Sequence, residues 1–315
     1  MLITTPSLHK LRRAAPTCAI ALIALIACAL FASSAAASEA PAAAKHSATA
    51  KARALTPSSP VTRGSAYLAL GDSVTFGYQE PTVVPAPDYM DASSFHGYPE
   101  QLGAELHLKV ANAACPGETS ASMINPAAPN EGCEGAYRKM FPLHVHYTGS
   151  QLHFALGYLG KHRNVRLVSL MIGANDAFLC QGSTPDHCTS ASELSNLEAE
   201  ISHNVHTILS SIRNKAHYHG QIAIVNYYSL NYASAATNTQ SILLNTTVDR
   251  AAKPFHVEIA DGYGEFQLAS MRFGNQPCLA GLITELNATA GDCGIHPSFA
   301  GQTLLAASLA NAIKN

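Results

Sequence analysis

Four positions far apart in the chain have residue types that could act together in nucleophilic chemistry. Ser73 follows an apolar run, Tyr67–Leu70, and opens the next segment, so its hydroxyl is predicted at an exposed turn and helix start. Free N–H groups at such a start favour a developing negative charge. Gly117 and Asn175 follow later apolar runs, and His296 precedes the last helical pattern. On its own, the serine would equally be interpreted as a helix cap.

Alternating strand and helix patterns predict the elements that would bring these positions together. Strands are expected at Tyr67–Leu70, His107–Ala113, Val165–Ile172, Gln221–Tyr227 and His256–Ala260, and helices at Tyr98–Leu106, Ser150–Leu159, Ser192–Ala216, Thr239–Lys253 and Pro297–Ile313. This alternation indicates an α/β fold with a parallel sheet covered on both faces. Ligands of such sheets bind outside the carboxyl ends of the strands. Because Ser73, Gly117 and Asn175 follow the first three strands, and His296 precedes the last helix, we expect them to share one cleft.

Four sequence blocks resemble, in order, those of the SGNH (GDSL-type) hydrolases. They are Gly71-Asp72-Ser73, the Gly117 of CPGETS, Gly173-Ala174-Asn175-Asp176, and His296-Pro297, and the resemblance covers residues 65 to 315. It implies a flavodoxin-like three-layer α/β/α sandwich with a parallel central sheet, the SGNH hydrolase fold. It also implies hydrolysis of carboxylic acyl esters (EC 3.1.1-type) without a cofactor. The cysteine pattern is similar to that of secreted actinobacterial lipases and esterases of this family.

The resemblance implies a role for each of these residues. Ser73 would be the nucleophile, and His296 would accept its proton and return it to the leaving alcohol. The backbone N–H groups of Ser73 and Gly117 and the side chain of Asn175 would form the oxyanion hole. A glycine is expected at 117 because a side chain would crowd the approach of the substrate. Asp176 is expected to brace the turns around Ser73 rather than contact substrate.

The sequence departs from the family at the residue that should orient the histidine. The family usually has an aspartate three residues before it, whereas Cys293 holds that position here and Asp292 lies one residue further back. We predict Asp292 as the third catalytic residue, and a backbone carbonyl would fit equally well. Glu285 and Asp261 are further alternatives.

Six cysteines of the predicted domain fall in three sequence-local couples, whereas Cys18 and Cys28 lie in the N-terminal segment. Of the 15 pairings that six cysteines permit, the nearest-neighbour one is predicted. It joins Cys115 to Cys133, Cys180 to Cys188, and Cys278 to Cys293. No CxxC pair is present, so no metal site is expected.

The N-terminal 37 residues have the pattern of a signal peptide. A positive segment precedes an apolar run, Cys18–Phe31, and Ala35-Ala36-Ala37 offers a small-residue cleavage site. Residues 38–63 are rich in Ala, Ser and Pro and are predicted as a flexible linker, and residues 64–315 as the hydrolase domain. Leu25-Ile26-Ala27-Cys28 resembles a lipobox, so a lipid anchor at Cys28 is a minor alternative, and an uncleaved signal anchor is another. All three place the domain outside the cytoplasm.

Composition narrows the classes of partner. The 315 residues carry a formal net charge of -2 and no long basic run, which argues against a nucleic-acid partner. We therefore expect a secreted, monomeric serine esterase or lipase for small-molecule or lipid esters, with no cofactor and no stable membrane insertion after signal cleavage. A carbohydrate (acetyl) esterase of the same fold is one alternative. A non-catalytic secreted binding protein is the other, supported by the irregular position of Asp292.

Overall fold

A five-stranded sheet carries the candidate residues at one edge. In the computed structural model, which describes residues 56, 57 and 59–315, its strands are all parallel in the order β2-β1-β3-β4-β5. Their bounds are β1 Ala66–Gly71, β2 Lys109–Asn112, β3 Val165–Met171, β4 Gln221–Val225 and β5 Glu258–Ala260. All five predicted strands are confirmed within three residues at either end. The strand order is that of flavodoxin-like folds, as expected.

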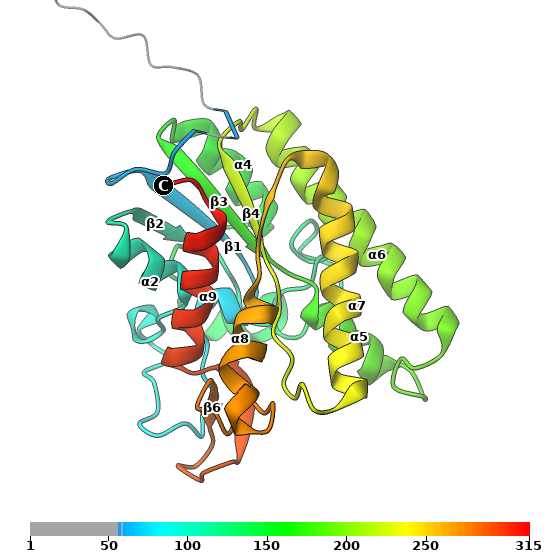
Figure 1. Ribbon diagram of the computed structural model, residues 1–315. Coiled ribbons are helices and arrows are strands. Elements are labelled where there is room, and N and C mark those ends of the chain that lie inside the picture. Colours follow the sequence, from blue (N-terminus) through cyan, green and yellow to red (C-terminus); the bar gives the residue numbers. More distant parts are fainter. Residues whose placement is uncertain (1–55, 58) are drawn as a thin grey trace, which may run out of the picture. The chain divides into compact units, whose positions relative to one another are not determined.

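Helices cover both faces of this sheet (Figure 1). On β1, Leu68 and Leu70 pack into a cluster with the helices of one face, whereas Tyr67 and Ala69 pack with those of the other. The first face is covered by α4 (Gln151–Lys161), α6 (Ala191–Ser210) and α7 (Ala235–Ala252), and the second by α2 (Tyr98–Glu105), α8 (Gly262–Ser270) and α9 (Phe299–Ala312). Strands buried on both faces need apolar residues at nearly every position, which is why their sequences are continuous apolar runs. Each fully buried leucine contributes roughly 1.5–3 kcal/mol relative to an exposed one.

The short helix α1 (Ser73–Phe76) begins at the helix start predicted for Ser73. Other elements beside the candidate site were not predicted, namely the helix α5 (Ala174–Ser183) and the antiparallel strands β6 (Ile283–Glu285) and β7 (Cys293–Pro297). His296 therefore lies on a strand. The last helix begins at Phe299 rather than Pro297, because the Ser298 side chain caps it by accepting a hydrogen bond from the Gly301 N–H.

The three predicted disulfides are confirmed. Cys115 is bonded to Cys133, Cys180 to Cys188, and Cys278 to Cys293. The last of these ties β7 to the loop that precedes β6.

The predicted signal peptide, Cys28 and most of the predicted linker lie outside the described residues. The final linker residues are described and pack on the domain. Val61 is buried and its N–H donates to the Lys314 carbonyl (2.7 Å), and the Ser59 carbonyl accepts from the Gln221 side chain (2.8 Å). Ordered packing therefore begins before Gly64. Among residues 56, 57 and 59–315, no helix has both the length and the apolar character needed to cross a bilayer.

Candidate active site

Ser73 and His296 meet at the carboxyl edge of the sheet. Ser73 is the first residue after the turn that follows β1, and Asp72 caps α1 by accepting from the Val74 N–H at 2.9 Å. β7 brings His296 from the other end of the chain, and its Nε2 lies 3.0 Å from Ser73 Oγ. This distance allows direct proton transfer from the hydroxyl to the imidazole.

Glu80 occupies the other side of the imidazole. Its Oε1 lies 2.8 Å from His296 Nδ1 and also accepts from the backbone N–H groups of Ile295 (2.8 Å) and His296 (3.3 Å). Burial raises the pKa of Glu80, but the hydrogen bond and the charge of His296 outweigh it and lower that pKa to about 2. The carboxylate is thus ionised at neutral pH, where it fixes the ring and favours the Nδ1–H tautomer.

The prediction of Asp292 in this position is wrong. Asp292 is exposed in the turn between β6 and β7, and within the described chain its side chain makes no hydrogen bond to His296. The two alternative carboxylates are also elsewhere, since Glu285 pairs with Cys293 across the two strands and Asp261 caps α8. A backbone carbonyl is not the partner either, because Nδ1 is taken by a side chain.

Gly294 makes room for the carboxylate. An added Cβ at this glycine would lie 2.0 Å from Glu80 Oε1 and 2.3 Å from its Cδ. Distances under 3 Å essentially never occur for real Cβ atoms, so any larger residue at 294 must displace Glu80. The glycine is thus a condition for the contact between Glu80 and His296.

Three N–H donors surround the space in front of Ser73. Within the described residues, the backbone N–H groups of Ser73 and Gly117 have no hydrogen-bond acceptor. Asn175 Nδ2 donates to the Glu118 carbonyl at 2.8 Å and lies 3.5 Å from Asp72 Oδ2, a separation too long for a strong bond. One amide hydrogen is thus anchored to Glu118, whereas the other makes only a long hydrogen bond to Asp72. Ser73, Gly117 and Asn175 line one cavity together with the imidazole.

The reason for a glycine at position 117 differs from the predicted one. Its φ is +83°, and an added Cβ would lie 2.3 Å from the Glu131 carbonyl oxygen. A side chain here would collide with the neighbouring backbone rather than with substrate. The glycine lets the turn close so that its N–H is presented to the cavity.

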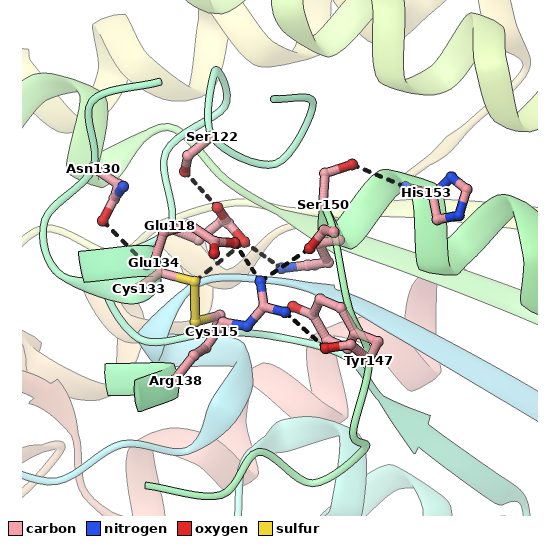
Figure 2. Close-up of polar contacts among 12 residues, drawn as sticks. Cys115, Glu118, Ser122, Asn130, Cys133, Glu134, Arg138, Tyr147, Ser150 and His153 are labelled. Carbon is pink, nitrogen blue, oxygen red and sulfur yellow. Dashed lines mark hydrogen bonds and ion pairs between the residues drawn. A yellow bond between two sulfur atoms is a disulfide. The ribbon is translucent and has the colours of Figure 1, made fainter. Parts of the chain in front are cut away.

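Buried polar contacts tie the turns of the site together, and the residues that make them were not predicted. Gln151 accepts from the Gly71 N–H (2.7 Å) and donates to the Gly71 carbonyl (3.0 Å) and to Glu118 Oε2 (3.0 Å). Figure 2 shows Glu118 beside the disulfide of Cys133, with the Ser122 hydroxyl donating to it. Burial raises the pKa of Glu118 to about 7. The network links the strand end before Ser73 to the turn of Gly117.

Asp176 acts on a different turn from the one predicted. It accepts from the backbone N–H (2.9 Å) and hydroxyl (2.5 Å) of Ser120, and Asn204 donates to the same hydroxyl oxygen at 3.0 Å. Asp176 therefore braces the segment after Gly117, not the turn around Ser73. Like Glu118, it lines neither of the cavities that border Ser73.

The described residues contain one compact group of potential metal ligands, Cys115, Glu118 and Cys133, whose ligand atoms lie within 4.8 Å of one another. Both sulfurs are joined in a disulfide, so the group offers no thiolate to a metal ion.

The sequence matches the GDSL-like Lipase/Acylhydrolase family over residues 69–304. A comparison with curated protein sequences finds no match. Among solved structures, phospholipase A1 from Streptomyces albidoflavus NA297 is 19% identical, covering 79% of this chain and 99% of its own, with a TM-score of 0.52. The lipase Lip_vut3 from a goat rumen metagenome is 13% identical, covering 79% and 98%, with a TM-score of 0.50. Axe2, an acetylxylan esterase from Geobacillus stearothermophilus, is 17% identical, covering 82% and 97%, with a TM-score of 0.46.

Proposed function

The chain belongs to the GDSL-like lipase/acylhydrolase family, and from this premise we propose that it is an exported serine esterase or lipase that hydrolyses carboxylic acyl esters through an acyl-enzyme at Ser73. The observation that carries the proposal is the continuous relay from Ser73 Oγ to His296 Nε2 (3.0 Å) and from His296 Nδ1 to Glu80 Oε1 (2.8 Å). A nucleophile, a base and a group that orients the base are the elements needed for acyl transfer.

Acylation begins when Ser73 Oγ attacks the ester carbonyl carbon. His296 Nε2 takes the hydroxyl proton, and Glu80 stabilises the resulting imidazolium through the Nδ1–H hydrogen bond. The carbonyl oxygen becomes an oxyanion held by the N–H groups of Ser73 and Gly117 and by the second amide hydrogen of Asn175, which exchanges its long contact with Asp72 for the oxyanion. The carbon–oxygen bond to the alcohol then breaks, and the imidazolium gives its proton to the departing oxygen.

Deacylation repeats these steps with water. His296 Nε2 removes a proton from the water molecule, whose oxygen attacks the acyl carbon and displaces Ser73 Oγ. The imidazolium returns its proton to Ser73, and the carboxylic acid leaves. No other reactant is required.

Export is supported by the three disulfides, because such bonds persist in oxidising compartments. The signal-like pattern of residues 1–37 supports it as well. Protein recovered from a culture medium should begin near Ser38, as read by mass spectrometry of the intact chain. Recovery of the full-length chain from the cytoplasm would contradict export.

The catalytic proposal is tested with a fluorophosphonate probe and a panel of p-nitrophenyl esters. The wild-type protein should be labelled at Ser73 and should hydrolyse the esters, and Ser73→Ala should abolish both. A folded protein that is neither labelled nor active would refute the proposal and favour the binding protein. Activity confined to acetylated oligosaccharides would replace the lipase assignment with a carbohydrate esterase.

A further inference from the structure

A narrow apolar cavity leads away from Ser73 between α5 and α7, two helices that lie beside each other in Figure 1. It has a volume of about 140 Å³, and Ser73 and His296 stand at one end. Its remaining walls are mainly apolar and include Ala174, Ala177, Leu230, Leu244 and Ile295.

A second cavity continues the first. It has a volume of about 40 Å³ and lies between α5, α6 and α7, with Leu194, Leu197, Ile201 and Leu243 in its walls. Ala177, Gln181, Gln240 and Leu244 line both cavities, so the two spaces adjoin. We call the two adjoining spaces the α5–α7 passage, and they extend from the nucleophile toward α6.

Small residues on α5 leave this space open. Ala174 and Ala177 are one helical turn apart, so both face the passage from the same side of the helix. Opposite them, Leu244 of α7 approaches the start of α5 so closely that a Cβ on Gly173 would lie 2.8 Å from its Cδ1. Larger side chains at the two alanines would fill the passage.

A third cavity opens on the other side of the nucleophile. Its volume is about 460 Å³, and its walls include Gly117, Gly132, Tyr137 and Phe141. Ser73, Asn175 and His296 line both this cavity and the α5–α7 passage, so a reacting carbonyl carbon would sit at their junction. The carbonyl carbon of an ester bears two substituents, the acyl chain and the alkoxy group, and each of the two spaces can take one of them.

We propose that the acyl chain of the substrate lies in the α5–α7 passage, that the alcohol lies in the cavity beside Gly117, and that the enzyme prefers acyl chains of medium or greater length to acetyl. This inference rests on the proposed function at Ser73. A linear alkyl chain suits a narrow apolar passage, because each buried methylene gains hydrophobic free energy. A sugar ring in the same place would meet mainly apolar walls, and its hydroxyl groups would find hydrogen-bond partners only at the few polar side chains there, such as Gln181 and Gln240.

The first test compares two ester series on the mature secreted protein. In p-nitrophenyl esters from acetate to decanoate, kcat/KM should rise about fourfold per methylene until the passage is full, or roughly 200-fold from butanoate to octanoate. In acetate esters of alcohols from ethanol to octanol, the rise should be much smaller. A flat acyl series, or a steeper alcohol series, would overturn the assignment of the two spaces.

The second test fills the passage. Ala177→Leu adds three carbon atoms at the junction of the two cavities, so it should lower the octanoate-to-acetate ratio of kcat/KM by roughly 60-fold, about fourfold for each methylene displaced. Ala199→Leu, on the exposed face of α6 and outside both cavities, is the matched control and should leave the ratio unchanged. An unchanged ratio in Ala177→Leu refutes the proposal.

A further variant tests the proposal even if Ala177→Leu does not fold. Leu243→Gln changes only the far cavity, so it should lower kcat/KM for decanoate several-fold more than for butanoate. Equal effects on both esters would contradict a chain that reaches this cavity. Failure of the underlying proposed function looks different, because then the wild-type protein would hydrolyse no ester and Ser73 would not react with the fluorophosphonate.

Discussion

Replacing Gly294 with alanine should slow catalysis without changing the side chains of Ser73 or His296. The new Cβ would lie 2.0 Å from Glu80 Oε1, so the carboxylate must move away from His296. Backbone strain is not the cause, since Gly294 is not among the residues with positive φ. The imidazole would keep its place near Ser73 but lose the acceptor that fixes its tautomer.

The size of the effect follows from the contact that is lost. A hydrogen bond to a charged group contributes about 1.5–3 kcal/mol. At 1.36 kcal/mol per tenfold change in rate, kcat should fall about 10- to 150-fold with little change in KM. Converting a fully buried triad carboxylate to an amide can lower kcat by about 10⁴-fold. The Glu80 side chain is 17% exposed, so water can partly replace its hydrogen bond to His296. We therefore expect the loss of kcat of about 10- to 150-fold rather than the loss of about 10⁴-fold.

Steady-state hydrolysis of a p-nitrophenyl ester measures this effect. Glu80→Gln should lower kcat by a similar factor, and the double variant with Gly294→Ala should be no slower than the slower single variant, because both changes remove the same interaction. Gly157→Ala is the matched control, since an added Cβ there meets nothing within 4 Å in the middle of α4. Full activity in Gly294→Ala would refute the role of Glu80. A double variant whose loss of kcat equals the product of the two single losses would refute it as well.

Three other perturbations test separate parts of the structure. Asn175→Ala should lower kcat about 100- to 1,000-fold, because one donor to the oxyanion is lost, and an unchanged kcat would remove Asn175 from the site. Burial raises the pKa of Glu118 from 4.5 to about 7, so its stabilising contribution is complete below pH 4.5 and is lost as the pH rises through 7. Urea unfolding of the wild type should therefore show a decline between pH 5 and pH 8 that is shallower in Glu118→Gln, and equal slopes would contradict this. Replacing Cys278 and Cys293 together by serine should lower the free energy of unfolding by about 3 kcal/mol, seen as a melting temperature about 6–12 °C lower, whereas an unchanged melting temperature would show that the disulfide adds no stability.

The central strands were predictable because burial on both faces requires a continuous run of apolar residues. β1, β3 and β4 are continuous apolar runs, and the structure places them within two residues of the predicted ends. The sequence of α5 contains no such apolar run. Its buried residues are the polar Asn175 and Asp176, and the small Ala174 and Ala177 border an open cavity instead of packing a core, so the usual apolar periodicity is missing.

The positions of the proposed nucleophile, Ser73, and of the N–H groups around it were also predictable, because each belongs to a short block at the end of a strand. Glu80 was not. It lies 216 residues from His296 in sequence, in a stretch without periodicity, and only the folded chain brings the two together. The segment around it, Tyr78–His96, is rich in Pro, Asp, Ser and aromatic residues, and nothing in it singled out this carboxylate.

The secondary structure around the histidine explains why the acid comes from so far away. The register of β7 against β6 is irregular, and the consecutive N–H groups of Ile295 and His296 both donate to Glu80 Oε1. Position 293 carries the disulfide to Cys278. Gly294 lies between this position and Ile295, and its missing side chain leaves the space that Glu80 occupies. Loss of the local aspartate, the glycine two residues before the histidine and the distant glutamate are thus parts of one arrangement. A chain with an acidic residue at position 80 and a glycine two residues before the histidine should need no aspartate beside it.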